Sequence, residues 1–305
     1  MKRYHDIAGD GGSEILKQIG AQRERIDARL SQIGLVVAVL SGKGGVGKST
    51  FAANLAAAWA LQGLAVGVLD ADLNGPSIAT MLGVRRQTFR LTPEGVAPAV
   101  GPLDIRVMSM DCFLPSDDTP VTWDGPARGT SVWRGAMEMT ALRELVSDTA
   151  WGALDLLVVD MPPGNDRLPH LTDIIPALAG VVMVTIPTGV SQLIVNKTFT
   201  VAKAAGVPVL GLVENMAGYA CSCCNAVGEL FGSGEAAALA AAQEVPFLGS
   251  LPFDGRIARQ SDGGVPFVIN HGDTPAGRVI LAVADALRSV LGLSPTGSSR
   301  EREKR

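Results

Sequence analysis

Long apolar runs are missing from this sequence. Aliphatic segments such as LDLLVVD and GVVMVTIP are far shorter than the roughly 20 residues that a membrane-spanning helix needs. A basic segment followed by an apolar one, the mark of a secretory signal, does not open the chain either. These absences predict a cytoplasmic protein with no membrane partner.

Positive charge is also in short supply. The chain carries 26 Lys and Arg against 30 Asp and Glu, a formal net charge of -4. Such a balance provides no general attraction to the phosphates of DNA or RNA. We therefore expect no nucleic-acid partner. An internal repeat is absent as well, which argues against a solenoid.

Cysteine is scarce and unevenly placed. Three of the four cysteines crowd into CSCC, namely Cys221, Cys223 and Cys224. Such crowding is a poor framework for disulfides and favours metal or redox chemistry. Cys221 and Cys224 form C-x-x-C, which allows two thiolates to bind one metal centre. A 4Fe-4S cluster or a structural zinc takes four ligands, and none of the three histidines is near in sequence.

One chain therefore supplies half of a metal site, and a two-fold homodimer would double it. Two alternatives stay open for this motif: a zinc clasp of the same geometry and a dithiol redox pair. Cys223 can be a spare ligand, a reactive thiol or neither.

Apolar residues are plentiful. They make up 47% of the 305 residues, with a mean hydropathy of +0.26, which is ample for a sizeable core. Short aliphatic runs alternate with helical patterns, as strands buried on both faces of a parallel sheet do. The fold class is therefore α/β, a parallel β-sheet flanked by helices. We expect its strands at 35–40, 64–70, 154–160, 180–187, 207–215 and 245–254.

The organisation around this core follows from composition. Residues 1–33 are expected to form an N-terminal amphipathic helical segment, with apolar residues on one face at Ile15, Ile19, Ile26, Leu30 and Ile33. Residues 34–295 form the main domain, and the charged residues 296–305 are expected to be disordered. A Pro- and Gly-rich stretch, 83–134, is interpreted as a long surface excursion. Residues 276–293 have the pattern of an amphipathic helix. Its polar face has few cations, unlike that of a membrane-targeting helix, so we predict that it docks on the core.

One glycine-rich loop carries a specific nucleotide signal. Residues 42–49 match G-x-x-x-x-G-K-[ST] between a predicted strand and a predicted helix. In such a loop the backbone N-H groups surround phosphate oxygens, Lys48 meets the β- and γ-phosphates, and Ser49 reaches Mg²⁺. The predicted nucleotide-binding residues here are Gly42, Lys43, Gly44, Gly45, Val46, Gly47, Lys48, Ser49 and Thr50.

Acidic residues follow two of the predicted strands. Asp70 and Asp72 leave one strand just before a Gly-Pro turn, where they can face Mg²⁺ and an attacking water. Asp160 ends another strand, in the place of a Walker B carboxylate that holds Mg²⁺ through water. The turn Pro162–Gly164 that follows can change conformation when the γ-phosphate leaves. Chance acidic residues at strand ends are the alternative.

The loop sequence KGGVGKST resembles the deviant Walker A (SIMIBI) type of P-loop NTPase, that of MinD, ParA and the nitrogenase iron protein. In that superfamily the first lysine, here Lys43, crosses a dimer interface to the partner's nucleotide, and Lys48 serves its own. A cation supplied in trans neutralises transition-state charge only when two chains face each other. The alternative for Lys43 is a solvent-facing lysine.

Further stretches resemble the Mrp/ApbC-type ATPases, cytosolic carriers of iron-sulfur clusters, from about residue 35 to about residue 266. They are DADLNGPS, VWRGAMEM, WGALDLLVVDMPPG, ENMAGYACSCC, LFGSGEA and VPFLGSLPFD. The resemblance implies catalytic roles for Lys43, Lys48 and Asp72, with Asp72 orienting water. It also implies that Asn215 contacts adenine and that Cys221 and Cys224 bridge a cluster between two subunits.

Three features depart from that family pattern. PPGNDRLPH stands where the family has PPGTGD, so the second switch can be displaced or slow. An additional TWDGP precedes VWRGAMEM, and residues 1–34 contain no cysteine, which excludes a second, ferredoxin-like cluster there.

The sequence thus predicts a homodimeric, slow ATPase with ATP, Mg²⁺ and a labile 4Fe-4S cluster that it transfers to recipient apoproteins. Ser49, Asp70 and Asp160 are the expected Mg²⁺ residues. The alternatives are a ParA/MinD-type positioning ATPase and an inert nucleotide-binding scaffold.

Overall fold

A computed structural model describes residues 15–293 apart from 88, 117, 120, 122–129, 165 and 231–234. The expected tail, residues 296–305, lies outside this range, as do residues 1–14 and the TWDGP insertion. Within the described residues, nine strands form the main sheet in the order β10-β9-β8-β1-β7-β2-β6-β5, with β11 also paired to β9. Neighbouring strands run parallel except for β10 on β9 and β5 on β6.

The six predicted strands are all present, which confirms the α/β fold class. Their bounds are β1 Ile33–Leu40, β2 Val66–Asp70, β7 Leu154–Asp160, β8 Leu178–Thr185, β9 Val209–Ala220 and β11 Phe247–Phe253. The remaining strands are short: β3 Leu91–Thr92, β4 Gly95–Val96, β5 Ala99–Val100, β6 Arg106–Met108 and β10 Val227–Glu229.

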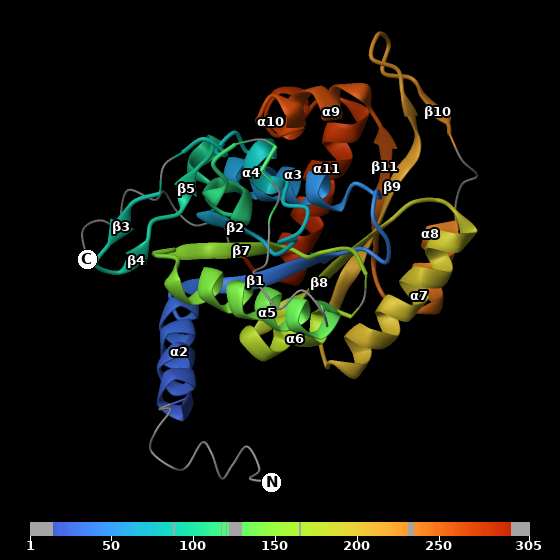
Figure 1. The fold of residues 1–305 in the computed structure, drawn as a ribbon. Helices are drawn as coiled ribbons and strands as arrows, with labels where there is room; N and C mark the ends of the chain where they lie inside the picture. The colour runs from blue at the N-terminus through green and yellow to red at the C-terminus, as the bar shows by residue number, and fades with distance from the viewer. Residues whose placement is uncertain are drawn as a thin grey trace.

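Helices cover both faces of the sheet (Figure 1). One face carries α3 Lys48–Leu61, α4 Ile78–Met81, α9 Gly255–Asp262, α10 Phe267–His271 and α11 Pro275–Val290. The other carries α2 Ile15–Leu30, α5 Thr130–Asp148, α6 Leu168–Ile174, α7 Gly189–Ala204 and α8 Glu235–Ala242. Two 3₁₀ turns, η1 Pro102–Asp104 and η2 Met110–Phe113, flank β6.

Strand β1 shows how the sheet divides the core. Val37 and Val39 belong to the apolar cluster on the α3 and α11 face, whereas Val36, Ala38 and Leu40 belong to the cluster on the α5 face. Successive side chains of a strand point to opposite faces, so an uninterrupted aliphatic run stabilises both layers. This is why β1 reads as a continuous apolar segment.

The C-terminal helix docks on the core, as predicted. Helix α11 packs against β11 and α3 and buries Ile280, Val283 and Leu287. The indole Nε1 of Trp59 in α3 donates to the carbonyl of Ala284 at 3.1 Å. Among the described helices, none unites enough length with enough apolar surface to cross a bilayer.

Two expectations about the chain's organisation need correction. The 83–134 stretch is not only a surface excursion, because β6 pairs in parallel with β2 and buries Val107 and Met108. Its strands are too short for their periodicity to show in the sequence. At the N-terminus, the predicted helix is present as α2, and Ile26 and Leu30 of its apolar face pack on the core. The prediction was wrong at its two other described positions, since Ile33 begins β1 opposite Leu154 and Ile19 is 55% exposed.

Candidate functional site

The loop between β1 and α3 has the backbone of a phosphate-binding loop. Gly45 and Gly47 have φ values of 77° and 81°, in the left-handed region that favours glycine. A Cβ on Gly47 would clash with Nδ2 of Asn215, so a side chain there would have to displace Asn215 and adopt a strained backbone conformation. Within the described residues, no side chain caps the N-terminus of α3. Its free N-H groups are therefore open to an anion.

A buried ion pair lies beneath this loop. Lys48 Nζ is 2.6 Å from Asp160 Oδ1, and the two side chains are 6% and 0% exposed. Lys48 Nζ also donates to Ser49 Oγ at 3.1 Å. Burial raises the pKa of the Asp160 carboxyl, and the Lys48 ammonium opposes that rise. The pair joins the first residue of α3 to the last residue of β7, the strand that neighbours β1 in the sheet.

Asp160 retains one unused oxygen. Its Oδ2 is buried and finds no hydrogen-bond partner among the described residues. A buried carboxylate oxygen without a partner is unfavourable. Beside the hydroxyl of Ser49, such an oxygen fits a hard cation with its water ligands. The donor set therefore fits the predicted magnesium.

Asp70 is engaged with the protein itself. Its carboxylate accepts hydrogen bonds from the N-H groups of Asp72, Ser77 and Ile78 and from Ser109 Oγ, at 3.0 to 3.2 Å. Burial, with a smaller contribution from Asp160, raises the pKa of Asp70 to about 7. The structure thus places Asp70 as the anchor of the 71–77 loop.

Asp72 and Lys43 are less buried. The Oδ1 of Asp72 accepts from Gly75 N at 3.2 Å, and the charge of Asp72 contributes to raising the pKa of Asp160. Lys43 is half-buried, and its carbonyl accepts from Ser41 Oγ at 2.9 Å. Its ammonium makes no ion pair within the described part of the chain. Asp72 therefore lies near the Lys48–Asp160 pair, while the Lys43 charge has no partner of its own there.

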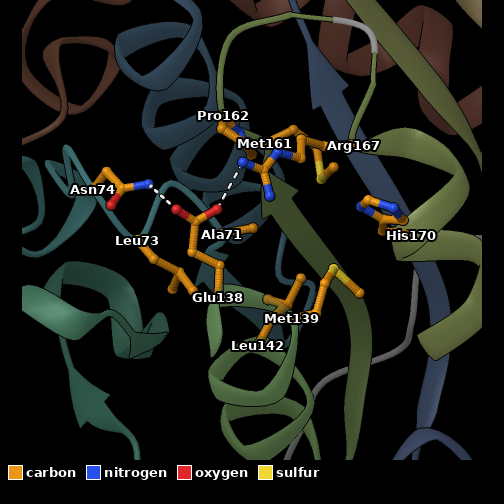
Figure 2. A pocket seen from close by; sticks show the side chains of 10 residues that line it. All are labelled: Ala71, Leu73, Asn74, Glu138, Met139, Leu142, Met161, Pro162, Arg167 and His170. Atoms are coloured by element: carbon orange, nitrogen blue, oxygen red, sulfur yellow. Dashed lines mark hydrogen bonds and ion pairs between the residues drawn. The ribbon is translucent and has the colours of Figure 1, made fainter. Parts of the chain in front are cut away.

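A carboxylate that the sequence analysis missed connects two loops at this end of the sheet. Glu138 on α5 is 6% exposed; it accepts from Asn74 Nδ2 at 2.8 Å and pairs with Arg167 Nη2 at 2.6 Å (Figure 2). Asn74 follows β2. Arg167 belongs to the PPGNDR segment after β7, which differs from the family pattern. Glu138 thus ties both loops to α5. In the sequence, the sign that Glu138 has a special role was a charged residue among the apolar side chains of GAMEMTAL.

A mainly apolar cavity of about 140 Å³ opens on the other side of the phosphate loop. Gly47 and Thr50 line one wall, and Phe253 and Ile257 of the turn from β11 into α9 line another. Asn215 stands between them; its Nδ2 donates to the Val46 carbonyl at 2.8 Å. Few polar groups in an apolar cavity are typical of a site for a flat organic group. The β11–α9 turn was not predicted as part of the site.

Cys221, Cys223 and Cys224 lie between β9 and β10. These two strands form a hairpin that stands off the sheet edge (Figure 1). The turn joins β9 to β10: Cys221 N donates to the Ala226 carbonyl, and Asn225 N donates to the Cys221 carbonyl. Hydrogen bonds from the N-H groups of Cys224 and Cys223 lower the pKa of the Cys221 thiol, which favours the thiolate. The turn therefore brings Cys221 and Cys224 together.

The described residues contain no group of three or more His, Cys, Asp and Glu side chains able to hold a metal ion. The C-x-x-C pair is thus two ligands on an open turn; Cys223 and Cys224 are both exposed. Cys112 lies elsewhere, in η2, where burial raises the pKa of its thiol to about 12.

This geometry, a glycine loop between a parallel strand and a helix with a lysine and a Walker B aspartate beneath it, is that of a P-loop NTPase. Comparison with known families narrows the class. Residues 32–288 match the family described as ParA, NUBPL iron-transfer P-loop NTPase. The chain belongs to this family, which confirms the predicted resemblance and is consistent with ATPase activity.

Individual relatives agree with this assignment. The chain is 38% identical to an iron-sulfur cluster carrier protein of Saccharolobus solfataricus, with 91% of each chain covered. It is 41% identical to one of Methanocaldococcus jannaschii, over 83% of this chain and 84% of the relative. A solved nucleotide-binding protein from Archaeoglobus fulgidus in complex with ADP is 36% identical, with a TM-score of 0.67, over 79% of this chain and 91% of that one.

The cell division ATPase MinD of Pyrococcus furiosus shares the fold alone. Its TM-score is 0.59 at 20% identity, over 84% of this chain and 99% of that one.

Proposed function

We propose that this protein is a homodimeric ATPase that holds a labile 4Fe-4S cluster between two subunits and transfers it to recipient apoproteins. One observation carries the proposal. In a chain of the iron-transfer family, Cys221 and Cys224 lie together on an exposed turn and supply two of the four ligands that such a cluster takes. A two-fold axis through that turn completes the set.

ATP binds at the phosphate loop. Residues 42–50 surround its phosphates, with Lys48 on the β- and γ-phosphates. Asn215 and the apolar cavity beside it take the adenine base. The ADP complex of the Archaeoglobus fulgidus relative supports a nucleotide here. We expect the base to be held mainly by shape, because the cavity offers few polar groups.

Magnesium supplies charge neutralisation at the phosphates when bound. Ser49 and Asp160 hold it, supported by the unpartnered Oδ2 of Asp160. Asp70 was predicted as a third Mg²⁺ residue. Its four protein hydrogen bonds favour a supporting role, in which it fixes the loop that carries Asp72.

Hydrolysis requires the dimer. Asp72 orients the attacking water, and Lys43 reaches the nucleotide of the partner subunit. The absence of an ion pair for the Lys43 ammonium within the described residues supports this role, since a side chain already paired in its own subunit would have to break that pair. The second switch, PPGNDR, is held by Arg167 on Glu138.

The protein is proposed to act in the cytoplasm, where thiols stay reduced and a labile cluster can be exchanged. A ParA/MinD-type positioning ATPase is the alternative. It shares the fold but gives no reason for a C-x-x-C turn.

Iron analysis of protein purified without oxygen tests the proposal. We expect about four irons and four sulfides per dimer after reconstitution, with thiolate-to-iron absorption in the visible range. Tight zinc with no iron would contradict the carrier function and favour a zinc clasp. ATP turnover in protein that holds neither iron nor zinc would favour the positioning ATPase, and a cluster without turnover would favour a scaffold.

A further inference from the structure

Strand β9 runs from the base cavity to the cysteine turn. Asn215 and Met216, in its middle, line the cavity, and the strand ends at Ala220, directly before Cys221. Strand β11 lies alongside it in parallel, with Leu251 opposite Asn215 and Phe253 opposite Tyr219. The same two strands therefore border the cavity and support the hairpin.

Arg256, in the first turn of α9, contacts both regions with one guanidinium. Its Nε and Nη2 bind the carboxylate of Asp254 at 2.9 and 2.6 Å; Asp254 is 1% exposed and lines the cavity. Its Nη2 also donates to Oδ1 of Asn225 at 3.0 Å. Asn225 directly follows Cys224, and its φ of 59° places it in the left-handed region of the turn.

A second contact joins the same two segments without Arg256. The rings of Tyr219, on β9, and Phe253, on β11, stack with their centroids 6.4 Å apart. Phe253 lines the cavity, whereas Tyr219 lies two residues before Cys221. The turn from β11 into α9 therefore touches the cavity on one side and the cysteine hairpin on the other.

We propose that Arg256 is a positioning residue that couples occupation of the base cavity to the conformation of the cysteine hairpin. The planar guanidinium binds a carboxylate in a fixed geometry. A shift of Asp254 when a nucleotide fills the cavity therefore moves Arg256 and its bond to Asn225. Coupling of this kind needs an element whose arrangement both sites bias, and the β11–α9 turn is that element.

The consequence for cluster transfer rests on the proposed function, but the coupling itself needs only nucleotide binding. The test therefore uses cluster-free protein at saturating ADP and Mg²⁺ and measures hydrogen exchange of the amides from Tyr219 to Glu229. In wild-type protein we expect ADP to slow exchange in this hairpin about fivefold. In R256Q the ratio of the exchange rate without ADP to the rate with ADP should fall from about five to about one.

Two further variants separate positioning from general stability. Asn225→Gly removes the acceptor but accepts the positive φ, so it should lose the response while leaving the Arg256–Asp254 pair in place. Asn225→Asp keeps an acceptor oxygen and should retain the response. The matched control is Arg259→Gln, which removes an exposed arginine from the same helix and should respond as wild type does.

A full ADP response in both R256Q and N225G would overturn the inference. Equal exchange rates in the wild-type hairpin with and without bound ADP would overturn it as well. Failure of the carrier function is distinguishable, since it shows as absence of iron in the anaerobic preparation and leaves the exchange result unchanged. Failure to bind ADP at all would refute the nucleotide site and this inference together, and the titration that sets saturation shows it directly.

Discussion

The phosphate loop and the cysteine hairpin are built in opposite ways. At the phosphate loop the charged groups are buried and paired, as with Lys48 at 6% exposure and Asp160 at 0%. On the hairpin, Cys223 and Cys224 are exposed, and the strand β10 that closes the turn has three exposed residues. One region is preorganised by the core and the other stands away from it.

The difference indicates what each region needs to function. A buried lysine and carboxylate are held by the sheet, so a single chain can present them to a nucleotide. The thiols of Cys221 and Cys224 on an open turn are an incomplete set for a centre with four ligands. Under the proposed function, the hairpin therefore needs a second copy and leaves its cargo open to acceptor proteins. Secure binding of nucleotide and easy release of a cluster are what the proposed function requires of these two regions.

The largest expected effect is on the hairpin. Replacing either Cys221 or Cys224 by serine removes two of four ligands in a symmetric dimer, so we expect complete loss of the cluster in iron analysis and visible absorption. The matched controls, Cys112→Ser and Cys223→Ser, should keep it, and all four variants should still bind ATP. A cluster that persists in Cys221→Ser would move the ligand set onto Cys223.

The next effect is at the phosphate loop. Lys48→Ala removes charge-assisted bonds to the phosphates and should weaken ATP binding about 100-fold in a calorimetric titration. Lys197→Ala, an exposed lysine on α7, is the control and should bind normally. Unchanged affinity in Lys48→Ala would mean that the buried pair with Asp160 is structural only.

Lys43→Ala should separate binding from turnover. We expect normal ATP affinity but a loss of hydrolysis of about 30-fold or more, since the charge acts across the dimer. Mixing this variant with Lys48→Ala gives heterodimers that keep one complete site, so part of the activity should return. Heterodimers that form and stay inactive would show that Lys43 does not act in trans.

Glu138 connects the two loops, and its removal should have a moderate effect. Glu138→Gln should lower turnover about tenfold, equivalent to ~1.4 kcal/mol, with little change in ATP affinity. Arg167→Gln should do the same, and the double variant should lose no more, since both act through one contact. Glu144→Gln, exposed on the same helix, is the control. Additive losses would exclude a shared role.

The smallest expected effect concerns Asp70. Because its pKa is raised to about 7, the folded state keeps a proton that the unfolded state releases near pH 4. The free energy of unfolding should therefore fall as the pH rises toward 7 and level off above it. Between pH 6 and 7.5 this fall should amount to about 1 kcal/mol in the wild-type protein, and Asp70→Asn should abolish it. Urea unfolding of nucleotide-free protein in EDTA measures it; parallel pH curves would contradict the assignment.

Sequence patterns predicted the parts of the molecule that depend on local order. The six predicted strands were recognisable because each contains a short, mainly apolar run between helical patterns or turn residues. The phosphate loop was recognisable because its glycines and lysine have fixed spacing. The short strand β6 was not, because three residues carry no readable period. The predicted apolar face of the N-terminal helix wrongly included Ile33, because apolar spacing does not mark where a helix ends and a strand begins.

The sequence by itself determined the fold class, the nucleotide loop, the family and the cysteine pair. Only the tertiary structure brought Asn74 and Arg167 to Glu138, and Asn225 to Arg256. These partners are separated by 64 residues for Asn74 and Glu138 and by 31 for Asn225 and Arg256. Such contacts follow no spacing rule. They arise because parallel strands place their carboxyl ends along one edge of the sheet, where loops distant in sequence meet.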